Sequence, residues 1–170
     1  MQTRTRTLSA VTLAAAMLFA TTAMAADLPK EGTFSHATYH FGTWKGTMVG
    51  KGQFLGSWDH NGLSIGNGIT DHLSWHCWGL SETQNGINQG NGYCVATDPD
   101  GDQIGGTTVA EKYASNAKTF RGLATFTAGT GKYAGISGSF TYVCHGNEFK
   151  AAAEGTYLAH CDGQGSYKLP

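Results

Sequence analysis

The chain has 170 residues, a formal net charge of −1, and 25 glycines against only three prolines. Residues 1–25 have a basic start, a short apolar stretch and a small-x-small cleavage site, the pattern of a secretory signal peptide. The remainder, residues 26–170, keeps nine basic and twelve acidic residues, a net charge of −3. This charge argues against nucleic acid or an anionic membrane as partner, because both need a basic patch.

The mature length suits one domain with a single core. No later segment reaches the roughly 20 apolar residues that a membrane-spanning helix needs. We therefore expect an exported bacterial protein, periplasmic or extracellular, without a membrane span. Glycine combined with aromatic and β-branched residues indicates turns between strands, whereas a disordered chain would lack the apolar content.

In chain order, the mature sequence predicts about eight to ten short strands and almost no helix. The expected strands are residues 32–41, 44–49, 53–58, 72–80, 92–97, 107–112, 118–126, 138–145, 148–158 and 165–169. Asn61-Gly62 is a type I′ hairpin signal before the strand that starts at residue 72. In that strand, Trp75 and Cys77 fall on one face and His76 on the other. Many short strands at regular spacing indicate an antiparallel sandwich or barrel.

The four cysteines fit an oxidising compartment, where an even number is typical of disulfides. Sequence alone permits three pairings. The sequence separation between Cys77 and Cys94 is the same as that between Cys144 and Cys161. Two neighbouring strands and their connection would span it, so we favour Cys77–Cys94 and Cys144–Cys161. Each closed loop contributes roughly 3 kcal/mol in the chain-entropy account. Metal ligation by these cysteines is disfavoured because CxxC spacing is absent.

The stretch FTAGTGKYAGISGSFTY, residues 126–142, is expected to form a hairpin and not a ligand loop. Gly129 and Gly131 would supply positive-φ turn positions between two strands. A phosphate-binding loop is excluded, because the stretch contains no GxGxxG and precedes no helix.

GTGKYAGISGSFTY in this stretch resembles the Gly-Thr-Gly-aromatic-x-Gly-x-x-Gly element of the allene oxide cyclase and dirigent barrel superfamily. With the preceding YCVATDPDGDQI, residues 93–104, it is similar to exported bacterial proteins that have such a barrel. The resemblance implies an all-β fold: an antiparallel eight-stranded, calycin-like, allene oxide cyclase-type barrel, here stapled by disulfides. No catalytic residue of the cyclases or dirigent proteins can be placed on this chain, so neither activity is carried over.

Two residue sets suggest a metal site. Asp98, Asp100 and Asp102 alternate as in a calcium loop, but the other EF-hand positions are missing, so a solvated turn is favoured. His72 and His76 would share one face of a helix, but on a strand they lie about 13 Å apart, too far to chelate one ion. No cofactor is expected.

Catalytic motifs are weak, because the GxSxG elbow is missing and adjacent Asp-His residues point to opposite strand faces. We therefore lean against an enzyme. The four tryptophans gather in one third of the chain, where rings that alternate with His and Ser suit the wall of a small-molecule pocket. The alternative is a barrel filled by its own side chains.

The favoured hypothesis is a barrel that binds a small apolar or amphipathic ligand in its interior. The residues expected to line the cavity are Trp58, His60, His72, Trp75 and His76. Two alternatives remain: a cyclase or isomerase that confines a lipid-like substrate, and an envelope structural or interaction protein with no cavity and a sizeable exposed apolar patch.

Overall fold

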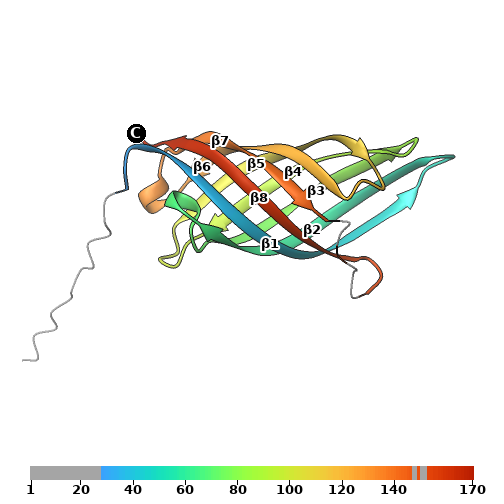
Figure 1. The fold of residues 1–170 in the computed structure, drawn as a ribbon, viewed down its shortest axis with the longest axis horizontal. Coiled ribbons are helices and arrows are strands. Elements are labelled where there is room, and N and C mark those ends of the chain that lie inside the picture. The colour runs from blue at the N-terminus through green and yellow to red at the C-terminus, as the bar shows by residue number, and fades with distance from the viewer. Residues whose placement is uncertain (1–27, 147–148, 150–152) are drawn as a thin grey trace, which may run out of the picture.

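Eight antiparallel strands form a closed barrel, in which each strand pairs with the next and β8 pairs with β1 (Figure 1). The computed structural model describes residues 28–146, 149 and 153–170; the expected signal peptide lies outside them. The strands are β1 (Glu31–Met48), β2 (Gln53–Gly66), β3 (Ser74–Gln84), β4 (Ile87–Thr97), β5 (Gln103–Ala114), β6 (Thr119–Gly129), β7 (Ser137–His145) and β8 (Thr156–Lys168). The expected all-β barrel is therefore confirmed. The described residues include no helix that is long and apolar enough to cross a membrane.

Both favoured disulfides are present, and both lie inside the barrel. Cys77 of β3 is directly opposite Cys94 of β4, and Cys144 of β7 is directly opposite Cys161 of β8. Each bond therefore closes one hairpin between neighbouring strands.

Three predicted strand breaks are wrong, and the third is the one between residues 158 and 165, which both lie in the single strand β8. The first two expected strands form the single 18-residue β1, which continues through Gly42. The expected hairpin at Asn61-Gly62 lies inside β2, where these residues pair with His76 and Trp75 of β3. The chain instead reverses at residues 49–52, where two glycines have φ of +69° and +76°. The expected strand 148–158 lies partly outside the described residues, and β8 begins at Thr156.

The predicted hairpin at residues 126–142 is confirmed. β6 ends at Gly129, the short helix η2 (Gly131–Tyr133) follows, and β7 begins at Ser137. Gly131 has φ of +49°, as expected, but Gly129 is not in the left-handed region. At Gly129 a glycine is required by space, because a Cβ would lie 2.1 Å from the Tyr133 carbonyl oxygen.

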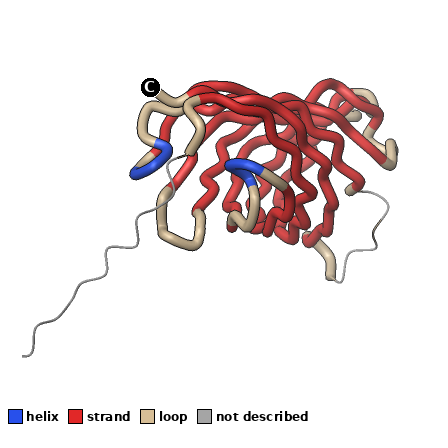
Figure 2. Tube along the Cα trace, turned by 60° about the vertical axis from the view of Figure 1, so that its left-hand side comes forward, coloured by secondary structure: helices blue, strands red, loops and turns tan. Residues whose placement is uncertain are grey.

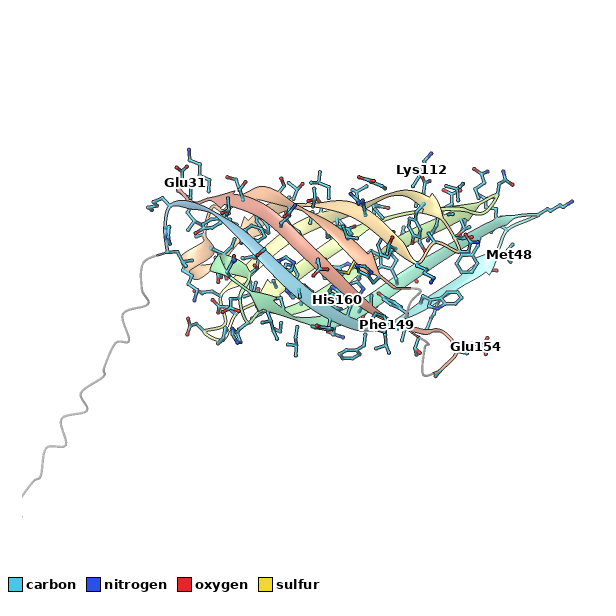
Figure 3. All side chains as sticks on the ribbon, in the orientation of Figure 1. Glu31, Met48, Lys112, Phe149, Glu154 and His160 are labelled. Atoms are coloured by element: carbon cyan, nitrogen blue, oxygen red, sulfur yellow. A yellow bond between two sulfur atoms is a disulfide. The ribbon has the colours of Figure 1, made fainter. Side chains whose placement is uncertain are left out.

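One end of the barrel is closed by a buried apolar cluster; we call it the closed end. Both short helices, η1 (Gly68–Thr70) and η2, and the C-terminus lie here (Figures 1 and 2). The cluster consists of Phe34, Ile69, Leu73, Trp75, Cys77, Ala96, Ile104, Ala124, Phe126, Tyr133, Ile136, Phe140, Tyr167 and Leu169. The opposite end carries the turns that join β1 to β2, β3 to β4 and β5 to β6, so β1 runs from Glu31 at the closed end to Met48 at that opposite end (Figure 3).

Glycines within the strands make room for large inward rings, a role that the expectation of glycine-rich turns did not include. The Trp58 ring lies over Gly79 and Gly92, where a Cβ would come within 2.3 Å and 2.6 Å of it. The Tyr142 hydroxyl lies over Gly122 in the same way, 2.1 Å from the position of a Cβ. An eight-stranded barrel is just wide enough to be filled by its own side chains or to hold one small ligand. Here rings matched to glycines occupy much of that space.

We predict that Gly79→Ala lowers the free energy of unfolding by about 1–3 kcal/mol, because the added methyl group collides with the Asn91 carbonyl oxygen, 2.2 Å from the Cβ position, and with the Trp58 ring, 2.3 Å from it. Gly105→Ala is the control, since a Cβ there would have its nearest neighbour at 3.6 Å, and we expect a change within about 0.5 kcal/mol. Urea unfolding with the disulfides intact measures both. Equal effects of the two substitutions would contradict the packing of Trp58 on glycine.

Candidate functional site

The structure divides the five residues that were expected to line one cavity. Trp58, His60 and Trp75 point into the barrel. His76 lies between inward-facing Trp75 and Cys77 and therefore points outward, because successive strand residues face opposite sides. His72 lies in the exposed connection before β3, with φ of 55°. The placement of His72 and His76 in the interior is therefore wrong.

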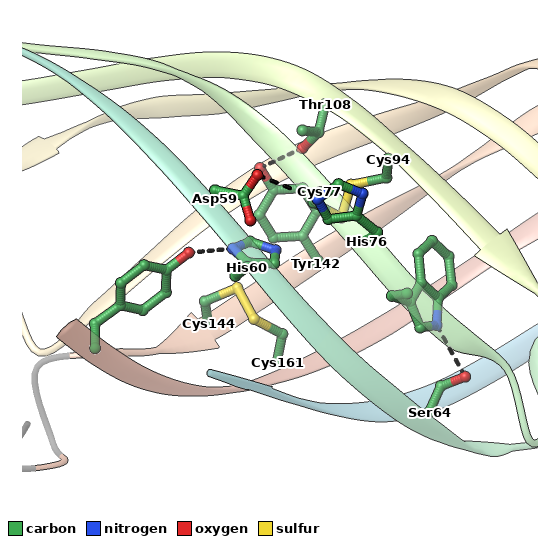
Figure 4. Close-up of a disulfide and its surroundings, with 12 residues drawn as sticks. Asp59, His60, Ser64, His76, Cys77, Cys94, Thr108, Tyr142, Cys144 and Cys161 are labelled. Carbon is green, nitrogen blue, oxygen red and sulfur yellow. Dashed lines mark hydrogen bonds and ion pairs between the residues drawn. A yellow bond between two sulfur atoms is a disulfide. The ribbon is translucent and has the colours of Figure 1, made fainter. Parts of the chain in front are cut away.

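The two histidines that lie outside the barrel interior, His72 and His76, have acidic partners on the outer surface. His76 Nε2 is 3.1 Å from Asp59 Oδ2 of β2 (Figure 4). His72 Nδ1 is 2.8 Å from Asp71 Oδ2, and both side chains are exposed.

The three aspartates of the suggested calcium loop are occupied by protein donors. Asp98 Oδ1 accepts backbone N–H groups of Asp100 and Asp102 at 2.9 Å and 3.0 Å. Lys132 Nζ is 2.6 Å from Asp98 Oδ2 and 2.7 Å from Asp100 Oδ2, and the Lys132 N–H donates to Asp102 at 3.1 Å. An ammonium group thus lies where a cation would be expected. No three His, Cys, Asp or Glu residues in the described part of the chain are placed to hold a metal.

The contacts of Lys132 with the three aspartates connect the turn between β4 and β5 to η2. Burial by itself would raise the pKa of Asp98, but the Lys132 ammonium and the N–H donors of Asp102 and Asp100 hold it below its usual range. The pKa of Lys132 is raised by the Asp100 and Asp98 carboxylates. DPDGD forms a turn as predicted, in which the Gly101 N–H donates to the Asp98 carbonyl at 3.1 Å. The expectation that its carboxylates face water is wrong for Asp98, which is buried.

Three inward histidines form the main titratable cluster inside the barrel; we call His36, His40 and His60 the histidine column. His36 and His40 are on β1 and His60 is on β2. The His40 and His60 ring centres are 4.4 Å apart, and Trp58 stacks on His60 at 5.2 Å. His60 Nδ1 shares a hydrogen bond with the hydroxyl of Tyr157 on β8 (Figure 4).

Glycines on the neighbouring strands fix the position of each ring in the column. A Cβ on Gly163 would lie 2.5 Å from His36 Nε2, and one on Gly62 would lie 2.5 Å from His40 Nδ1. A Cβ on Gly42 would lie 2.4 Å from the His60 Cβ. Among the described atoms, Nδ1 of His36 and Nδ1 of His40 are buried without a hydrogen-bond partner.

Burial keeps the column neutral. Desolvation lowers the pKa of His36 to about 4, although the charge of Asp162 opposes this, and lowers the pKa of His60 to about 4 against the opposing charge of Asp59. The pKa of His40 falls to about 3, because its burial is reinforced by the two other histidines. Burial also raises the pKa of Tyr157, so its hydroxyl stays protonated. At neutral pH the column is therefore uncharged.

The remaining polar groups that hydrogen-bond inside the barrel come from several strands. Tyr142 accepts a bond from Thr108 at 2.9 Å, and Trp75 Nε1 donates to Ser64 at 3.0 Å. These pairs satisfy polar atoms that would otherwise destabilise the interior.

Two hollows open onto the outer surface. The first, which we call the outer groove, has a volume of about 360 Å³ and lies over β1, β2 and β8. Its lining residues are Phe41, Gly42, Thr43, Asp59, Asn61, Ala153, Thr156, Tyr157 and Leu158. The second, of about 500 Å³, lies nearer the closed end, beside His36, Ile65, Val143 and Asp162.

Tyr157 is among the residues that line the outer groove and also hydrogen-bonds His60 of the histidine column, a connection that sequence reasoning missed. It pairs in register with Gly42 of β1, directly beside His60, because Gly42 also pairs with His60. These residues are far apart in the chain, and no local pattern brings them together. Only the closure of β8 onto β1 does so.

Comparisons of the chain with family models, with curated proteins and with solved structures found no match.

We predict that Lys132→Ala destabilises the fold by about 1–3 kcal/mol, because Asp98, whose side chain is 3% exposed, loses its cation. The control is Lys112→Ala at an exposed position of β5, which should change the stability by less than about 0.5 kcal/mol. Thermal unfolding measures both variants. An increase in the wild-type melting temperature on addition of calcium would contradict the assignment of these aspartates to Lys132.

Proposed function

We propose that this protein is an exported, non-catalytic binding protein that holds a small amphipathic ligand in its outer groove. The observation that carries the proposal is the composition of the groove wall. Phe41 and Leu158 are paired across β1 and β8 and are 61% and 41% exposed, and Asp59 and Asn61 lie on the β2 side. Apolar walls with a few polar groups, in a hollow of a few hundred Å³, are typical of small-molecule sites.

The polar side of the groove indicates the head group of the ligand. The Asp59 side chain is half-exposed, and its carboxylate can accept further hydrogen bonds beside His76. Asn61 adds an amide that donates and accepts. We therefore expect a ligand with an apolar body against Phe41 and Leu158 and an amine or hydroxyl head against Asp59.

The filled interior supports binding outside the barrel and argues against a ligand within it. Trp58, Tyr142 and the histidine column occupy the space next to glycines, so a ligand would have to displace rings that the strands hold in place. A cyclase or isomerase that confines its substrate needs an enclosed site. The outer groove is open to solvent, which favours binding over catalysis.

A second candidate function, interaction with a protein partner, is favoured by exposed apolar residues on another face. Trp78 and Tyr93 pair across β3 and β4, and Val109 and Leu123 pair across β5 and β6. Leu80 is 65% exposed on the same side of the sheet. Clusters of this kind mark protein interfaces in soluble proteins.

We predict that decylamine binds the wild-type protein and that Leu158→Ser weakens its affinity about tenfold, because the side chain loses its contact with the alkyl chain. Leu80→Ser is the matched control and should bind decylamine as the wild type does. Decanoate should bind more weakly than decylamine because of Asp59. Isothermal titration calorimetry at pH 7 measures all of these.

Equal losses in both leucine variants, or no binding of either ligand, would overturn the groove proposal. If Leu80→Ser, but not Leu158→Ser, abolished self-association in sedimentation experiments, the interaction function would be favoured instead.

A further inference from the structure

We propose that the protein docks onto the surface of anionic lipid bilayers through the part of its β1–β2 hairpin that extends past β8. We call residues 44–55 the projecting hairpin. The inference goes beyond the proposed function and does not rest on it, because the projecting hairpin and the outer groove share no residue.

The projecting hairpin extends beyond the barrel wall. β1 pairs with β2 as far as Met48 and Phe54, whereas its pairing with β8 ends at Thr43 and Thr156 (Figures 1 and 3). Trp44 and Met48 continue the inward face of β1, yet they are 45% and 61% exposed. Residues of the same alternation between positions 34 and 38 are buried. The hairpin therefore presents to solvent an apolar face that the barrel encloses elsewhere.

Further apolar side chains surround the tip of this hairpin. Val49 and Leu55 are exposed, and so is Ile87 at the start of β4, on the neighbouring turn. At the closed end, by contrast, Ile69 and Leu73 of the connection between β2 and β3 are buried. Apolar side chains near these connections are thus buried at one end of the barrel and exposed at the other.

Hydrogen bonds between neighbouring turns hold the tip in place. The Asn85 amide of the β3–β4 turn donates to the Gly52 carbonyl of the β1–β2 turn at 2.9 Å. The Ser115 amide after β5 donates to the Gly86 carbonyl at 2.8 Å. Three turns therefore form one connected rim, and an ordered rim loses little conformational entropy when it binds a surface.

The charge of the projecting hairpin suits an anionic surface. It contains two exposed lysines, Lys45 and Lys51, and no carboxylate. Glu82 of the neighbouring β3 accepts hydrogen bonds from Gln53 and Gln89. A lysine close to an anionic bilayer strengthens binding about fivefold, so the two lysines complement lipid phosphates.

The net negative charge of the protein does not extend to this end. The connections of the closed end contain four aspartates and one lysine, namely Asp71, Asp98, Asp100, Asp102 and Lys132. The three turns of the rim contain two lysines and no carboxylate, and the described part of the β7–β8 connection adds Glu154. The 18 residues of β1 span roughly 60 Å along the strand, several times the distance of about 8 Å over which salt screens charge. The overall acidity, which argued against an anionic membrane as partner, is therefore screened at the rim.

A lipid surface fits this combination better than a second copy of the chain does. A tryptophan and lysines beside an apolar tip are typical of segments that lie in the membrane interface, where lysines extend to the phosphates. Two projecting hairpins that met tip to tip would place Lys51 against Lys51, with no carboxylate in either hairpin to pair with them.

Co-sedimentation with vesicles of equal parts phosphatidylglycerol and phosphatidylcholine tests the apolar contact. We expect the wild type to bind and Met48→Ser/Val49→Ser to bind at least tenfold more weakly, because the tip loses its apolar side chains. Leu63→Ser/Ile65→Ser is the matched control, since both side chains are equally exposed but lie on the outer face of β2. It should bind within about twofold of the wild type.

Two further comparisons test the charge. Lys51→Gln should weaken binding about fivefold, whereas Lys168→Gln, at the closed end, should leave it unchanged. The wild type should bind vesicles of phosphatidylcholine alone at least tenfold more weakly than the mixed vesicles. Equal binding to both kinds of vesicle, or equal effects of the two lysine substitutions, would overturn the assignment to anionic lipid.

The remaining outcomes also decide the proposal. Absence of vesicle binding overturns it, as do equal losses in the two double variants or full binding by Met48→Ser/Val49→Ser. Self-association that this variant abolishes, without vesicle binding, would assign the tip to a second copy and overturn lipid docking. Decylamine binding is measured without vesicles, so its failure would count against the proposed function alone.

Discussion

The narrow interior of an eight-stranded barrel is the constraint on which the rest of this structure depends. Large side chains that point inward must share a small space with those of the facing and neighbouring strands. This chain meets the constraint in part by placing glycine beside large rings, as with Trp58 over Gly79 and Gly92. The resulting barrel is closed at one end by an apolar cluster, and two disulfides inside it each join a pair of neighbouring strands.

The same packing determines the chemistry of the histidine column. Imidazoles held against glycines lose hydration, and burial lowers their pKa values although the charges of Asp162 and Asp59 oppose this at His36 and His60. At the closed end, the Lys132 ammonium group neutralises Asp98 and Asp100 and thereby connects η2 to the turn between β4 and β5. Buried polar groups in this barrel are therefore either neutral or paired.

Because side chains occupy the barrel interior, the proposed binding site lies on the outer face. The proposed binding groove depends on Gly42 and on the pairing of Phe41 with Leu158, both features of the β1–β8 seam. Tyr157 belongs to the interior by strand alternation and to the groove by position, so it can connect the two. The sequence predicted ligand-lining residues inside the barrel, whereas the groove proposed as the binding site lies on its outer face.

The sequence by itself determined the all-β class, the hairpin around Gly131 and the opposite orientations of Trp75 and His76, and it favoured the two disulfide pairs among three possible pairings. These follow from local spacing, because strand alternation and turn chemistry act over a few residues. It did not reveal that β1 continues through Gly42 or that Asn61-Gly62 lies within a strand, since a glycine that faces a ring from another strand has the same local pattern as a glycine in a turn. Only the tertiary structure brought His40, His60 and Tyr157 together, because closing the barrel sets the register of β8 against β1.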